Sequence, residues 1–102
     1  MIKAKFTKNV NDSIELLIEG HALFGEYGKD VICGAVSSIV IGGLNALNDI
    51  SNFDVVIKEG FVKVQSKNKI SEEDKIVINT ILIQLETIEE KFPNYIKVIR
   101  EE

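Results

Sequence analysis

Apolar and polar residues alternate at the start of the chain, over residues 2–7 and again over residues 13–19. The turn-forming sequence Asn9-Val10-Asn11-Asp12 separates the two runs. A period of two is typical of strands that bury one face. The first 19 residues are therefore predicted to form an antiparallel hairpin, which brings His21 to its far end.

A helical pattern of apolar residues begins after Asp30, a residue type that favours the N-cap position, and continues to about Ile50. Gly42-Gly43 lies inside this pattern. Each glycine weakens a helix by about 0.5–1 kcal/mol relative to alanine, so we expect a bend or the close approach of another backbone there. Ser51-Asn52 is predicted to end the helix.

The second half of the chain predicts two strands, a helix and a last strand. Residues 53–57 and 62–65 alternate on either side of the tight turn Glu59-Gly60. Ser71-Glu72-Glu73-Asp74 resembles a capping box, and its acids are interpreted as a helix start and solvated surface. The helix is predicted to run from about Glu72 to Lys91, because Pro93 cannot continue it. Residues 95–100 form the last predicted strand.

The predicted order of elements is ββαββαβ, with short connections and no linker. It indicates an α+β fold with two layers, in which two helices cover one face of a mostly antiparallel or mixed five-stranded sheet. A length of 102 residues suits one domain, residues 1–102, with a modest core.

The second predicted helix carries more apolar residues than one buried face requires. Its core stripe is predicted to comprise Val77, Ile81, Leu85, Ile88 and Phe92. Further apolar residues flank this stripe, Ile76 and Ile83 on one side, Ile78 and Leu82 on the other. A helix that is apolar around most of its girth is normally buried on more than one side, which suggests a homodimer. Packing against the first helix could use part of this surplus.

Composition narrows the functional classes. The net charge of −4 and the scattered lysines argue against direct nucleic-acid binding. No apolar run is long enough for a membrane span, and the N-terminal residues lack the apolar block of a signal peptide. One cysteine cannot form an intramolecular disulfide. We therefore expect a cytoplasmic protein with no membrane partner.

The chain contains one cysteine, Cys33, and one histidine, His21, which together suffice for nucleophilic acyl chemistry. Cys33 falls in the first turn of the predicted helix, where unpaired N–H groups and the helix dipole favour a thiolate. The same N–H groups could hold the negative oxygen of a tetrahedral intermediate. In the alternative interpretation, Cys33 is a small buried hydrophobe and His21 a polar residue at a strand end.

Neighbouring residues have candidate supporting roles. Asp30 is predicted mainly to cap the helix, and Ser37 lies one helical turn after Cys33 on the same face. The glycine-containing loop after the hairpin could close over a substrate or simply pack onto the domain; its candidate binding residues are Gly20, Leu23, Phe24, Gly25, Tyr27 and Gly28. One cysteine and one histidine cannot complete a zinc site, and no phosphate-binding glycine motif occurs, so no metal or cofactor is expected.

The motif Gly20-His21-Ala22, then Gly28, Asp30-Val31-Ile32-Cys33 and Ser37, resembles the signature of the ribosomal-processing cysteine proteases, the Prp family. The resemblance implies a Cys–His dyad, with Cys33 as nucleophile and His21 as base. It also implies a homodimer whose substrate is the N-terminal extension of large-subunit ribosomal protein twenty-seven, cut after an aromatic pair. Gly34 departs from the family, whose members commonly carry alanine there.

Two other functions remain open at this point. A small acidic dimer could be a non-catalytic ribosome-assembly module that binds the tail of a ribosomal protein, with Cys33 inert. Alternatively, the chain could be a cysteine hydrolase that acts on another peptide. The reactivity of the thiol separates the first alternative from a protease, because an inert cysteine has the pKa of an ordinary thiol, near or above about 8.5.

Overall fold

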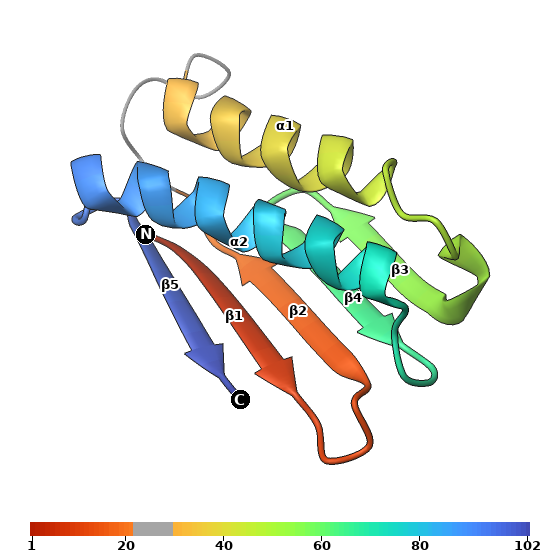
Figure 1. The fold of residues 1–102 in the computed structure, drawn as a ribbon. Coiled ribbons are helices and arrows are strands. Elements are labelled where there is room, and N and C mark those ends of the chain that lie inside the picture. Colours follow the sequence, from red (N-terminus) through yellow and green to blue (C-terminus); the bar gives the residue numbers. More distant parts are fainter. Residues whose placement is uncertain (22–29) are drawn as a thin grey trace.

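The computed structural model describes residues 1–21 and 30–102, which form a five-stranded sheet and two α-helices (Figure 1). In chain order the elements are β1 (Ile2–Lys8), β2 (Ile14–Glu19), α1 (Val31–Leu44), a 3₁₀ turn (Ile50–Asn52), β3 (Phe53–Lys58), β4 (Phe61–Ser66), α2 (Glu72–Lys91) and β5 (Ile96–Glu101). This order of strands and helices confirms the predicted ββαββαβ arrangement.

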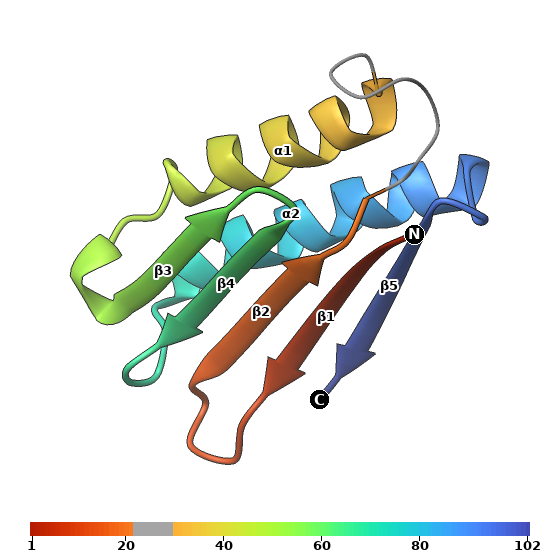
Figure 2. The ribbon, with the colours of Figure 1, turned by 180° about the vertical axis from the view of Figure 1, so that it is seen from behind.

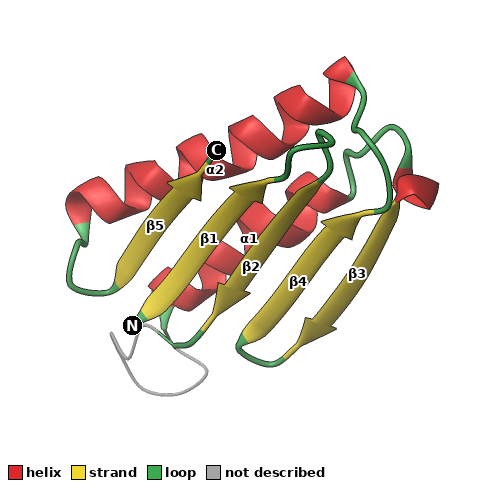
Figure 3. Cartoon of the chain, turned by 90° about the horizontal axis from the view of Figure 1, so that it is seen from below, coloured by secondary structure: helices red, strands yellow, loops and turns green. Residues whose placement is uncertain are grey.

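The sheet is mixed and has the strand order β3-β4-β2-β1-β5. β1 pairs antiparallel with β2 and parallel with β5, whereas β4 pairs antiparallel with both β2 and β3. Both helices lie on the same face of the sheet and run in opposite directions (Figure 2, Figure 3). The predicted two-layer α+β fold is therefore confirmed.

The core lies between the sheet and the two helices, and the sequence pattern explains its composition. Alternate residues of β1 and β2 are buried, as expected for strands with one covered face. Helix α1 contributes residues at a spacing of one turn, namely Ile32, Val36, Val40 and Leu44. Cys33 is partly buried and packs against this core.

Helix α1 is shorter than predicted, because it ends at Leu44 and not near Ile50. Beyond it the backbone N–H groups of Asn48 and Asp49 donate to the two carboxylate oxygens of Asp74, at 2.6 and 3.1 Å. A 3₁₀ turn then leads into β3. The apolar spacing continues past the true end of the helix, whereas these long-range hydrogen bonds decide where the chain turns.

Asp74 is buried, although the sequence pattern placed it on solvated surface at the start of α2. Only 1% of the residue is exposed. Its own N–H donates to Oγ of Ser71, the N-cap of α2, at 3.2 Å, as the capping box predicts. The hydrogen bonds of Asp74 thus join the segment after α1 to the first turn of α2.

Gly43 allows the two helices to pack closely. A Cβ atom on Gly43 would overlap the side chain of Ile81 in α2, whereas a Cβ atom on Gly42 would face open space. The close approach predicted at these glycines therefore involves one of them, and the neighbour is a side chain and not a backbone.

The buried stripe of α2 is rotated relative to the predicted one. The residues that it buries are Asp74, Ile78, Ile81, Leu82 and Leu85, while three members of the predicted stripe, Val77, Ile88 and Phe92, are only partly buried. The rotation arises because α2 packs against both the sheet and α1. The flank with Ile76 and Ile83 stays on the surface, 68% and 50% exposed. Neither helix in the described residues has the length and hydropathy needed to cross a bilayer.

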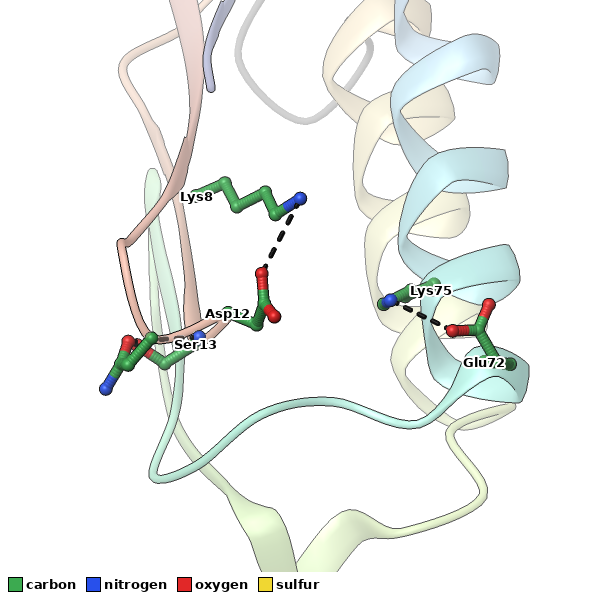
Figure 4. Close-up of polar contacts among 6 residues, drawn as sticks. Lys8, Asp12, Ser13, Glu72 and Lys75 are labelled. Carbon is green, nitrogen blue, oxygen red and sulfur yellow. Dashed lines mark hydrogen bonds and ion pairs between the residues drawn. The ribbon is translucent and has the colours of Figure 1, made fainter.

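Ion pairs mark the end of the molecule where the β1–β2 turn approaches the start of α2 (Figure 4). The Lys8 ammonium lies 3.7 Å from the Asp12 carboxylate, and the Lys75 ammonium lies 3.0 Å from that of Glu72. The hydrogen bond from Lys75 lowers the pKa of Glu72 and, reciprocally, raises that of Lys75. A cavity of about 340 Å³ lies at this end, and neither the chain's cysteine nor its histidine lines it.

Candidate active site

The N-terminus of α1 holds Cys33 through the side chain of Asp30. One carboxylate oxygen, Oδ1, accepts the backbone N–H groups of Ile32 and Cys33 at 2.9 and 3.1 Å. The backbone of Asp30 is extended (φ −74°, ψ 104°), as usual for an N-cap. Asp30 therefore caps α1, as its sequence position predicted, and Cys33 occupies the third helical position.

Three amides near the start of α1 are already hydrogen-bonded, contrary to the expectation that they could hold a tetrahedral intermediate. The N–H groups of Ile32 and Cys33 donate to the Asp30 side chain, and that of Gly34 donates to the Asp30 carbonyl at 3.1 Å. That expectation is wrong for these three amides. The spacing of the sequence placed amides near the thiol but did not show that the capping residue occupies them.

The Cys33 thiol also contacts Asp30. Its Sγ donates to Oδ2, the second carboxylate oxygen, at 3.5 Å, and Cys33 is half-buried. This hydrogen bond requires a protonated thiol, whereas the positive end of the helix dipole favours a thiolate. Because the carboxylate stabilises the protonated form, formation of the nucleophile requires a base that draws the proton away.

His21 leaves the end of β2 through a glycine that no other residue could replace without strain. Gly20 has a φ of +105°, and a Cβ atom on it would overlap the carbonyl oxygen of Met1. Its N–H donates to the carbonyl of Gly60, in the β3–β4 turn, at 2.9 Å. The imidazole of His21 then lies against Gly60. The end of β2 thus places His21 near the start of α1.

His21, Asp30, Cys33 and Ser37 line one cavity of about 600 Å³ between α1 and the β3–β4 hairpin. Much of the remaining wall is apolar and comprises Ile2, Ile18, Val36, Val40, Ile41, Ile57, Phe61 and Val62. An apolar cavity with a few convergent polar groups is the usual form of a site for an organic ligand. The charged side chains on its rim include Lys58 and Glu59.

The structure brings five of the predicted site residues to this cavity, namely Gly20, His21, Asp30, Cys33 and Ser37. Ser37 is exposed and follows Cys33 by one turn of α1. The other predicted binding residues lie outside the described residues; they are Leu23, Phe24, Gly25, Tyr27 and Gly28.

The sequence reasoning missed the β3–β4 turn as part of the site. It identified Glu59-Gly60 as a tight turn, and Gly60 indeed has a positive φ of +68°. The missing step was the pairing of β2 with β4, in which Glu19 lies opposite Phe61 and the turn comes to rest beside His21. No local sequence pattern predicts this contact, because β2 and the β3–β4 turn are distant in sequence.

The described residues offer a thiol and an imidazole as reactive groups. In that part of the chain no three His, Cys, Asp or Glu side chains gather in a way that could hold a metal ion. A thiol beside a helix N-terminus, an imidazole and an apolar cavity together can support acyl transfer to a cysteine.

Comparison with known proteins agrees with this chemistry. The family model described as cysteine protease Prp matches residues 1–97. The ribosomal processing cysteine protease Prp of Mycoplasma genitalium is 30% identical over 106 residues, which cover 100% of this chain and 97% of the relative. The protein of the same name from Staphylococcus aureus is 29% identical over 105 residues, with 96% and 97% coverage.

Solved structures extend the likeness to three dimensions. The S. aureus ribosomal processing protease Prp with a covalently linked product peptide has a TM-score of 0.86 at 28% identity. The same protease with a substrate peptide has a TM-score of 0.80 at 27% identity, and both comparisons cover 99% of this chain and 100% of the other. The chain therefore belongs to the Prp family of cysteine proteases and is a hydrolase.

Proposed function

We propose that this protease removes the N-terminal extension of large-subunit ribosomal protein twenty-seven, cutting after an aromatic pair. Cys33 is the nucleophile and His21 the base in this proposal. The observation that carries it is the position of both side chains on one cavity, whose apolar wall suits an aromatic side chain. The names of the relatives, ribosomal processing cysteine proteases, support the substrate class.

The proposed reaction starts with a proton transfer from the Cys33 thiol to His21, which breaks the hydrogen bond to Asp30. The thiolate attacks the carbonyl carbon of the scissile peptide bond. The carbon–nitrogen bond then breaks, and the amine leaves with the proton from His21. Water hydrolyses the resulting thioester while His21 takes a proton from that water, and the thiol is restored with the acid product.

Residues 22–29 are proposed to help bind the substrate. The two residues that flank this segment, His21 and Asp30, border the cavity, and the segment's sequence carries Phe24 and Tyr27. The protein is further proposed to act in the cytoplasm as a homodimer. The exposed Ile76 and Ile83 on one flank of α2 support the dimer.

The test is cleavage of a synthetic peptide that spans the N-terminal extension, followed by mass spectrometry. The wild-type protein, Cys33→Ala and His21→Ala are compared, with Val10→Ala in the β1–β2 turn as a control, because Val10 is fully exposed and lies outside both the cavity and α2. We expect one cut after the aromatic pair with wild type and control. Cys33→Ala should abolish it, and His21→Ala should slow it by about 10²–10⁴-fold, since a general base contributes that much.

Each other outcome contradicts a different part of the proposal. Cleavage by folded Cys33→Ala would exclude Cys33 as the nucleophile. An intact peptide with reduced wild-type protein would exclude this substrate and favour a different peptide. Full activity of His21→Ala would exclude His21 as the base.

A further inference from the structure

The imidazole of His21 rests on the one residue of the β3–β4 turn that lacks a side chain. A Cβ atom on Gly60 would lie 2.6 Å from Nε2 and 2.9 Å from Cε1 of His21. Both distances are shorter than a van der Waals contact, so the ring could not keep its present place above any other residue. The space beside Gly60 is thus occupied by the histidine.

The same turn also holds the backbone that carries His21. The carbonyl of Gly60 accepts the N–H of Gly20, the residue before His21, at 2.9 Å. Gly60 has a φ of +68°, which glycine adopts without strain. The turn therefore restrains His21 in two ways, through a hydrogen bond to the preceding residue and through its contact with the imidazole ring.

His21 is exposed, and its ring is the far end of a side chain that can rotate. An added Cβ atom would therefore displace the ring, and the backbone strain at the positive φ of residue 60 would come in addition. The displacement would change the placement of the ring relative to Cys33 on the opposite side of the cavity. A side chain at residue 60 would thus act on the position of the base as well as on the turn.

We propose that Gly60 is a positioning residue for the protease reaction, which holds the His21 imidazole where it can take the Cys33 proton. The proposal rests on the proposed function of these two residues. It predicts that a side chain added at residue 60 lowers activity by displacing the His21 ring. Asp30, Lys58 and Glu59 are charged residues that share the cavity with His21, and none of them changes in the test.

The test uses Gly60→Ala and Gly60→Asn in the full chain. Asparagine tolerates a positive φ better than alanine does, so the second variant adds a Cβ atom with less backbone strain. Gly42→Ala is the matched control, because it adds a Cβ atom in open space outside the cavity. Both variants at residue 60 should lower kcat on the peptide by about 10- to 100-fold, as expected for a misplaced base, with a smaller change in KM.

Two further measurements depend on the single histidine and the single cysteine of the chain. The single imidazole gives one set of ring signals in NMR spectra. The nuclear Overhauser spectrum of wild type should show a cross-peak between the His21 Hε1 proton and a Gly60 Hα proton, because the two groups are in contact. Alkylation by iodoacetamide reports one thiol, and the dependence of its rate on pH should change in both Gly60 variants but not in Gly42→Ala. A purely structural role would lower the melting temperature without changing this profile.

Wild-type kcat and an unchanged alkylation profile in either folded Gly60 variant would overturn the proposal. If neither variant folds, absence of the cross-peak in wild type would overturn it. Failure of the proposed function can be told apart from failure of this proposal. Full cleavage by His21→Ala would show that His21 is not the base, whatever the Gly60 variants do. Loss of cleavage in His21→Ala with full cleavage in Gly60→Ala would refute the positioning role alone.

Discussion

Asp30 interacts with the backbone of the first turn of α1 through one oxygen and with the Cys33 thiol through the other. The capping bonds fix the start of the helix, whereas the bond to sulfur affects the protonation of the thiol. These two effects belong to different atoms of the same residue. A substitution that preserves one and removes the other can therefore separate them.

Replacing Asp30 with asparagine should keep the cap but remove the negative charge beside the thiol. We expect nearly unchanged stability and faster alkylation of Cys33 near neutral pH, because the neutral amide no longer favours the protonated thiol. Asp30→Ala should also lose the cap, at a cost of about 1 kcal/mol in the free energy of unfolding. Thermal denaturation and iodoacetamide kinetics measure both effects, and unchanged alkylation of Asp30→Asn would contradict the argument.

At the scale of elements, one buried carboxylate decides how α1 and α2 are connected. The carboxylate of Asp74, in the first turn of α2, accepts hydrogen bonds from the backbone N–H groups of Asn48 and Asp49. The irregular segment after α1 thus has partners for two of its backbone donors. Without the Asp74 carboxylate, both N–H groups would lose this hydrogen bond, and the segment would no longer be joined to the start of α2.

Replacing Asp74 with alanine should destabilise the protein by about 1–3 kcal/mol, because it removes the buried, charged acceptor of two part-buried backbone N–H groups. Glu73→Ala is the matched control, because Glu73 is exposed in the same helical turn. It should cost about 0.5 kcal/mol, through the helix dipole alone. Chemical denaturation measures both variants, and equal losses would contradict the role of Asp74.

At the scale of the whole molecule, the apolar flank of α2 is the surface that we expect to mediate a dimer. Wild type should sediment as a dimer and Ile83→Glu as a folded monomer, because burying an unpaired charge in an interface is costly. Ile50→Glu is the control, since Ile50 is similarly exposed but lies in the 3₁₀ turn. Sedimentation equilibrium measures the mass; a monomeric wild type, or a dimeric Ile83→Glu, would contradict the prediction.

The sequence was sufficient for the order of elements and for the start of both helices. Strand alternation depends on neighbours two residues apart, and the caps Asp30 and Ser71 act within one helical turn. It was insufficient for the end of α1 and for the rotation of α2. Both depend on contacts between distant segments, through Asp74 and through the packing of Ile81 against Gly43.

The candidate site divides in the same way. The chain's single cysteine, single histidine and capping aspartate were identifiable from the sequence, because residue type and local spacing determine their chemistry. Only the tertiary structure decided that the β3–β4 turn supports His21 and that Asp30 occupies the amides beside Cys33. Those relations depend on strand pairing and on side-chain direction, which local sequence spacing does not encode.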